Sequence, residues 1–218
     1  MMRRGLFTGI AAAGLFAGLG IGAAQADFAL TILHVNDLHS RLEPINKYDS
    51  TCGKDDDAEG KCFGGIARIK AKVDERRAAL SQAGRNVLML DAGDQFQGSL
   101  FYTTYKGAAA AEFMNAIGFD AMAVGNHEFD DGPEGLAAFL EKVDMPVLSG
   151  NVDVENEPTL KGKVPGTLVL EVGGEKVGIV SVLAEDTSET SSPGANVHFL
   201  RAETYLKGAV EGLEAAGV

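Results

Sequence analysis

The sequence predicts an α/β fold built on a largely parallel sheet with helices packed against it. Apolar runs typical of strands alternate with stretches whose apolar residues recur at helical spacing, and this order favours parallel strands. Three of the apolar runs end abruptly in polar residues, at 36–39, 92–98 and 125–132. Because the carboxyl ends of parallel strands share one edge of a sheet, we expect these polar segments to lie together.

Each expected element follows from its own pattern. The first apolar run is nearly continuous, which is typical of a strand buried on both faces. The expected strands are residues 28–35, 86–91, 120–124 and 146–149, followed by a hairpin at 167–182. The expected helices are residues 64–83, 107–117, 133–143 and 202–216. Residues 187–196, rich in Ser, Pro and Gly, predict a surface loop.

The first 26 residues are expected to be a secretory signal peptide. Arg3 and Arg4 precede an apolar stretch, and residues 24–26 form an Ala-Gln-Ala cleavage site. A membrane anchor is the competing interpretation, but the many glycines and weakly apolar alanines argue against a stable span. The folded domain is therefore expected to occupy residues 27–218, in the periplasm or outside the cell.

The composition excludes some classes of partner. The chain carries a net charge of −12, which becomes −14 without the two arginines of the leader. Such an acidic protein is a poor match for a nucleic-acid backbone or an anionic membrane surface, so neither a nucleic-acid polymer nor a membrane is expected as a partner.

Two cysteines, Cys52 and Cys62, flank a short polar segment. In an exported protein they favour a local disulfide, although a pair of zinc ligands is the alternative. The acidic run at 55–57 lacks the ligand spacing of a calcium loop and is expected to lie in a solvated loop.

The polar segments after the strands carry related chemistry. Asp37 and His39 follow the first strand, Asp94 follows the second, and Asn126 and His127 follow the third. Carboxylate, imidazole and amide donors together suit Zn, Mn, Fe or Co. Asp94, on the middle strand of the three, is placed to bridge two ions. In the third segment, Asp131 could instead simply cap the next helix.

In order, these motifs resemble the calcineurin-like metallophosphoesterases, in their 5′-nucleotidase branch. The resemblance rests on residues 37–39, 93–98 and 125–130, and extends to the segments 63–68 and 193–196. It implies a metallophosphoesterase-type α/β sandwich with helices on both faces of a layered sheet. It also implies hydrolysis of nucleoside 5′-monophosphates, as small-molecule substrates, with two divalent ions, Zn, Mn or Co.

The resemblance implies a role for each motif residue. Asp37 and His39 would hold the first metal, Asp94 would bridge, and Asn126 would hold the second. His127 would face the phosphate, with Asp130 orienting it; a metal ligand or a structural cap is the alternative for His127. Glu128 is expected to support the site without binding a metal. His34, inside the first strand, is expected to be packed and hydrogen-bonded, and His198 to be structural or exposed.

The pattern also predicts an incomplete domain at the C-terminus. The family completes its metal shell with further histidines and a glutamine and binds the nucleoside in a C-terminal domain, and we expect both to be absent from this chain. The 218 residues alone would then bind the second metal weakly. The competing functions are a related hydrolase of cyclic nucleotides, nucleotide sugars or sulfur esters, and an inert metal-binding domain.

Overall fold

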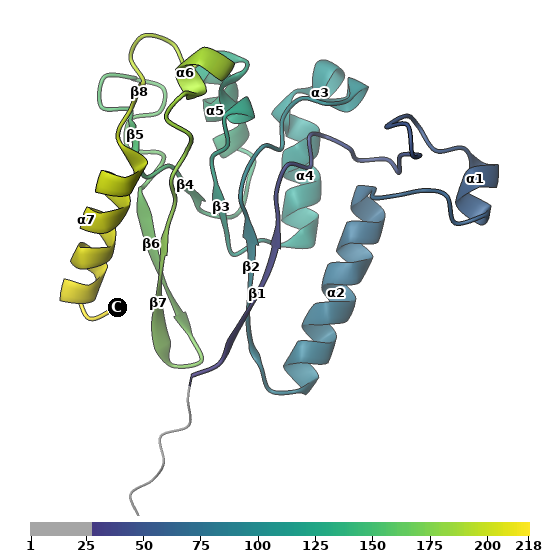
Figure 1. Cartoon of the computed structure of the whole chain (residues 1–218), viewed down its shortest axis with the longest axis horizontal. Helices are drawn as coiled ribbons and strands as arrows, with labels where there is room; N and C mark the ends of the chain where they lie inside the picture. Colours follow the sequence, from purple (N-terminus) through teal and green to yellow (C-terminus); the bar gives the residue numbers. More distant parts are fainter. Residues whose placement is uncertain (1–27) are drawn as a thin grey trace, which may run out of the picture.

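The computed structural model describes residues 28–218, and its centre is a four-stranded parallel sheet (Figure 1). The strands are β1 (Leu30–Val35), β2 (Asn86–Asp91), β3 (Ala121–Ala123) and β4 (Val147–Leu148), in that spatial order. Their register aligns Val35 with Asp91, Asp91 with Met122, and Met122 with Val147. The carboxyl ends of the strands therefore lie at one edge of the sheet, and the predicted α/β fold is confirmed.

Helices connect the strands and bury the core against the sheet. The helical elements of this half are α1 (Lys54–Ala58), α2 (Ile66–Gln82), α3 (Leu100–Tyr105), α4 (Gly107–Ile117), the 3₁₀ turn η1 (His127–Phe129) and α5 (Gly132–Leu140). Met89 and Met122 from the sheet and Met114, Phe129 and Leu136 from the helices are almost completely buried in a single core. Burial of such side chains contributes about 1.5–3 kcal/mol each. Helix α3 was not predicted from the sequence.

The second half of the chain adds a hairpin and one smaller antiparallel pairing of strands. Its elements are β5 (Val152–Asp153), β6 (Thr167–Val172), β7 (Glu175–Val180), α6 (Thr187–Thr190), β8 (His198–Phe199) and α7 (Ala202–Ala215). Strands β6 and β7 are antiparallel, and Gly173 and Gly174 turn between them with positive φ angles of 59° and 87°. Helix α7 packs on β7, where Leu213 lies against Gly178 (Figure 1).

The interpretation of the first strand as buried on both faces is wrong. Strand β1 lies at the edge of the sheet, and the Ile32 side chain is 52% exposed. His34 is exposed as well, and its side chain makes no hydrogen bond within residues 28–218, so it is not the packed, bonded side chain expected. An apolar run predicts that a strand forms, but it does not predict whether the strand lies at the centre or at the edge of the sheet.

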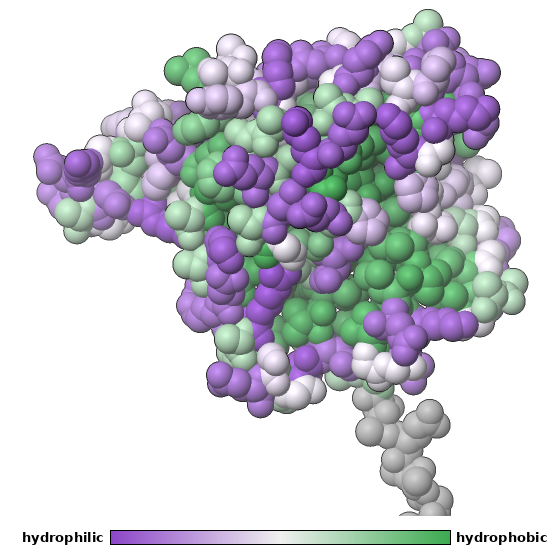
Figure 2. Space-filling model, turned by 180° about the vertical axis from the view of Figure 1, so that it is seen from behind, coloured by the Kyte–Doolittle hydropathy of each residue, from purple (hydrophilic) through white to green (hydrophobic). Residues whose placement is uncertain are grey.

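The surface has a marked apolar component. Large side chains such as Val169, Leu206 and Val210 are exposed, and Figure 2 shows a broad hydrophobic area on the face opposite to that in Figure 1. Within residues 28–218, no helix combines the length and apolarity needed to cross a bilayer. The signal peptide expected at 1–26 lies outside the described residues.

The predicted disulfide between Cys52 and Cys62 is confirmed. The bond closes the exposed loop that carries α1, and Ile45 pairs with Thr51 and Phe63 beside it. No free cysteine remains among the described residues, so the zinc alternative is not realised.

Replacing both cysteines with serine is expected to lower the free energy of unfolding by about 2–3 kcal/mol, because the open chain regains the entropy of a short loop. Urea denaturation of the double variant measures the change, and the wild-type protein under reducing conditions is the matched control. Equal midpoints for variant and wild type would contradict the expectation.

Candidate metal centre at the strand ends

The three predicted polar segments meet at the carboxyl edge of the sheet. The loop after β1 hydrogen-bonds to the loop after β2 through the N–H groups of Asp37, His39 and Ser40, which donate to the carbonyls of Gly93, Asp94 and Gln95 at 2.9, 3.1 and 2.9 Å. The loop after β3 joins them where the His127 N–H donates to Asp94 Oδ1 at 3.0 Å. The parallel strands thus bring residues 37, 94 and 127 to one place.

Three side chains at this edge could share a cation. Ligand atoms of His39, Asp94 and His127 all lie within 4.8 Å of one another. The Phe96 carbonyl accepts from His39 Nδ1 at 3.1 Å, so Nδ1 carries a proton and Nε2 is the nitrogen that can bind a metal. His39 Nε2 is 3.6 Å from Asp37 Oδ1. An imidazole held through one nitrogen while the other faces a carboxylate is the arrangement expected of a metal-binding histidine, so these residues fit a divalent ion.

Asn126 lies between the third strand and the 3₁₀ turn η1. Its side chain is half-buried and makes no hydrogen bond within residues 28–218. The backbone carbonyl of Asn126 accepts from the Phe129 N–H at 3.1 Å. The amide is therefore available to a ligand. The structure brings His39, Asp94 and His127 directly together, places Asp37 beside His39, and places Asn126 next to His127 in the chain.

The backbone around these donors is strained. Five non-glycine residues of the first two loops have left-handed φ angles: Asp37 (51°), His39 (45°), Ser40 (50°), Asp94 (57°) and Gln97 (64°). Residues other than glycine rarely adopt this backbone region, and each one that does lowers the stability of the fold by about 1–3 kcal/mol. Strain concentrated at one edge of the sheet is typical of a functional site, where the surrounding structure holds side chains in required positions.

Close packing of the loops depends on two glycines. A Cβ atom at Gly93 would lie 2.5 Å from the Gly125 nitrogen, and one at Gly125 would collide with the Asp94 carboxylate. Only glycine allows the second and third loops to approach this closely.

His127 belongs to a short chain of side chains. Its Nδ1 bonds Asp130 Oδ2 at 2.7 Å, and Asp130 Oδ1 accepts from the Ser191 hydroxyl at 2.7 Å. Burial alone would lower the pKa of His127, but the hydrogen bond and charge of Asp130, together with Asp94, raise it above its usual value. The pairing of His127 with Asp130 agrees with the sequence prediction. Ser191 lies in the stretch predicted to be a surface loop. Most of that stretch is exposed, but it also contains a short helix, α6, and Ser191 reaches Asp130.

Glu128 clamps the second loop to the third. Its carboxylate is fully buried, and each oxygen accepts two backbone N–H groups. Oε1 accepts from Gln95 at 2.8 Å and Phe96 at 3.3 Å, and Oε2 accepts from Asp94 at 2.9 Å and Gly125 at 2.7 Å. Burial raises the pKa of Glu128 to about 7, although these N–H donors favour the charged form. Glu128 thereby holds Asp94 against the start of the third loop.

Two further carboxylates stabilise the surroundings. Asp91 accepts from the Gly93 N–H at 2.7 Å and from the Gln95 side chain at 2.8 Å, and burial raises its pKa to about 8. Asp131 accepts from the Tyr102 hydroxyl at 2.6 Å and from Lys106 at 3.1 Å. It occupies the N-cap position of α5 but makes no capping bond, so the helix-cap interpretation of Asp131 is wrong.

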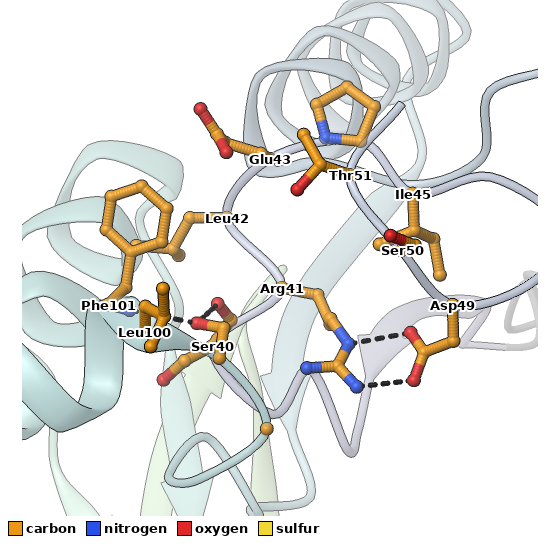
Figure 3. Close-up of a pocket in the computed structure, with 13 residues that line it drawn as sticks. Ser40, Arg41, Leu42, Glu43, Ile45, Asp49, Ser50, Thr51, Leu100 and Phe101 are labelled. Atoms are coloured by element: carbon orange, nitrogen blue, oxygen red, sulfur yellow. Dashed lines mark hydrogen bonds and ion pairs between the residues drawn. The ribbon is translucent and has the colours of Figure 1, made fainter. Parts of the chain in front are cut away.

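A cavity of about 290 Å³ opens beside the first loop (Figure 3). Leu42 and Phe101 form part of its wall, and the Arg41 guanidinium crosses it to bond both oxygens of Asp49 at 2.9 and 2.5 Å. The cavity adjoins the candidate centre because two of its lining residues contact or neighbour His39. Ser40 follows His39 in the chain, and a Cβ atom at Gly98 would lie 2.8 Å from the His39 Cβ. Ser99 in turn donates to the Ser40 carbonyl at 2.6 Å, which joins the two loops at the cavity wall.

Comparison with known proteins agrees with this geometry. Residues 30–203 match the family model described as calcineurin-like phosphoesterase. The chain is 43% identical over 200 residues to a 5′-nucleotidase of Bos taurus, covering 89% of this chain and 33% of the relative. It thus spans about a third of the length of that relative.

Solved structures give the same result. A 5′-nucleotidase precursor from Thermus thermophilus superposes with a TM-score of 0.77 at 42% identity, covering 88% of this chain and 36% of the other. The NAD nucleotidase of Haemophilus influenzae superposes with a TM-score of 0.74 at 33% identity, covering 86% and 32%. On the match of residues 30–203 and on these likenesses, the chain belongs to the calcineurin-like phosphoesterase family.

Proposed function

We propose that this protein is an exported, metal-dependent phosphohydrolase that converts nucleoside 5′-monophosphates to nucleoside and phosphate. The observation that carries the proposal is the convergence of the His39, Asp94 and His127 side chains from three strand ends, with Asp130 bonded to His127. The names of the Bos taurus and Thermus thermophilus relatives support a nucleotide substrate.

Two divalent ions, Zn, Mn or Co, are the proposed cofactors. Asp37 and His39 would hold the first, Asp94 would bridge, and Asn126 would hold the second. When bound, such ions polarise a phosphoryl oxygen and lower the pKa of water. Asp94 is fixed in position for this role. Its N–H donates to the Glu128 carboxylate, and its Oδ1 accepts from the His127 N–H.

His127 is the proposed catalytic group. Asp130 accepts from Nδ1, which directs Nε2 away from Asp130 as the nitrogen free to act on a substrate. The negative charge of Asp130 stabilises the imidazolium, which holds a proton on Nε2. That proton can bond a phosphate oxygen or pass to the leaving oxygen of the ester.

Export to the periplasm or the cell exterior completes the proposal. The Cys52–Cys62 disulfide supports it, because disulfides persist in oxidising compartments. The acidic composition agrees with a small-molecule substrate and with neither a nucleic-acid polymer nor a membrane as partner.

A dinucleotide is the second candidate substrate, favoured by the likeness to the Haemophilus influenzae NAD nucleotidase. Phosphate release from AMP and cleavage of NAD, measured side by side with the same preparation, decide between the two. The proposal predicts the higher kcat/KM for AMP, and a higher value for NAD would replace it with the second candidate.

Asp94→Asn is expected to lower the affinity for Mn²⁺ by about 100-fold or more, because a bridging anion becomes a neutral amide. The amide oxygen can still accept from the His127 N–H, so the fold is retained. Titration calorimetry measures the affinity, and Asp55→Asn, in the exposed acidic run of α1, is the matched control with wild-type affinity. Unchanged affinity in Asp94→Asn would remove Asp94 from the metal site.

A further inference from the structure

The segment that follows β7 reaches back to the candidate centre. Ser191 is 61 residues from Asp130 in sequence, yet its hydroxyl donates to Asp130 Oδ1 at 2.7 Å. The other oxygen of the same carboxylate bonds His127 Nδ1 at 2.7 Å. Within residues 28–218, these two groups are the only hydrogen-bond partners of the Asp130 carboxylate.

The position of Ser191 is set by the structure around it. Thr187, at the start of α6, is completely buried, and its hydroxyl donates to the Ala184 carbonyl at 2.7 Å. The Ser191 N–H donates to the Thr187 carbonyl at 2.9 Å. After Ser191 the chain packs on α5, where a Cβ at Gly194 would lie 3.7 Å from the Pro133 ring. Ser191 is therefore presented to Asp130 by a packed segment.

We propose that Ser191 is a positioning residue for the hydrolytic reaction, acting through Asp130 on His127. The inference rests on the proposed role of His127. A terminal carboxylate rotates easily, since its last torsion has only a broad preference. With Oδ1 held by Ser191, Oδ2 stays directed at Nδ1, which keeps the proton on that nitrogen and fixes the direction of Nε2.

The hydroxyl group of Ser191 is the part of the side chain that holds Asp130. Ser191→Ala removes the donor and leaves Asp130 with one partner. Ser191→Thr and Ser191→Val are a matched pair of nearly equal shape, of which only threonine can donate. Ser192→Ala, at the exposed neighbour, controls for general effects on the segment.

The first measurement is steady-state hydrolysis of AMP with Mn²⁺. Ser191→Ala and Ser191→Val are expected to lower kcat by about 10-fold while KM stays within about twofold of wild type, because the substrate contacts are untouched. Ser191→Thr is expected to retain most of the wild-type kcat, and Ser192→Ala all of it. Equal kcat values for the threonine and valine variants would overturn the proposal.

The second measurement does not depend on turnover. Long-range ¹H–¹⁵N NMR of the imidazoles, in protein with diamagnetic Zn²⁺ added and at a pH above the His127 pKa where the ring is neutral, reports which nitrogen of His127 carries the single proton. Wild type and Ser191→Thr are expected to keep Nδ1 protonated, and Ser191→Ala and Ser191→Val to show a mixed population. An unchanged signal in Ser191→Ala overturns the proposal even if kcat falls. Absence of hydrolysis by wild type would instead refute the proposed function, and the NMR comparison would still decide the role of Ser191.

Discussion

Replacing His127 with alanine is expected to lower kcat for AMP hydrolysis by about 10²–10⁴-fold, the usual contribution of a positioned acid or base. The reason is the loss of the imidazole that Asp130 supports and that faces the candidate centre. The affinity for Mn²⁺ is expected to stay within about threefold of wild type, since Asp37, His39, Asp94 and Asn126 remain as donors.

Kinetics and calorimetry on the same preparation separate the two roles open to His127. His198→Ala, at an exposed histidine of β8, is the matched control and is expected to match wild type in both measurements. Asp130→Asn is expected to lower kcat to an intermediate degree. If His127→Ala loses metal together with turnover, His127 is a metal ligand, as its closeness to His39 and Asp94 also permits.

Glu128→Gln is expected to destabilise the fold by about 2–6 kcal/mol. Each carboxylate oxygen of Glu128 accepts two backbone N–H groups, so either orientation of a glutamine amide turns its NH₂ group toward two donors. Each donor left unsatisfied in a buried site costs about 1–3 kcal/mol. The loops that carry Asp94 and His127 lose their common clamp, so the affinity for Mn²⁺ is expected to fall as well.

Urea denaturation measures the first effect and calorimetry the second. Glu134→Gln makes the same chemical change six residues later, at an exposed position of α5, and is expected to alter stability by no more than about 0.5 kcal/mol. A Glu128→Gln protein as stable as the Glu134→Gln protein would show that the four N–H groups do not depend on the carboxylate.

Much of the fold was predictable because its signals are local. Strand β2 and helix α4 were predicted with the observed ends, since each is a contiguous pattern bounded by polar residues or glycine. The grouping of His39, Asp94 and His127 followed from one further step, the shared edge of parallel strands. The His127–Asp130 contact was also predictable, because three residues across a turn bring the side chains within reach.

The remaining features depend on tertiary pairing that residue patterns do not encode. Ser191 meets Asp130 only because the segment after α6 packs on the start of α5, and nothing in a Ser- and Gly-rich stretch signals that contact. Exposure of Ile32 reflects the edge position of β1 rather than its composition. Asp37 and Asp94 have left-handed backbone angles and lie in loops that hydrogen-bond to one another. The sequence did not predict these angles, because neither residue is a glycine.

The central claim is that the strand-end cluster is a divalent-metal site for phosphate-ester hydrolysis. Phosphate release from AMP by metal-depleted protein, before and after addition of Mn²⁺, tests it most directly. We predict no release without the ion, release after its addition, and no recovery in Asp94→Asn at the Mn²⁺ concentration that restores wild type. Equal release by wild type with excess chelator and with Mn²⁺ would contradict the claim.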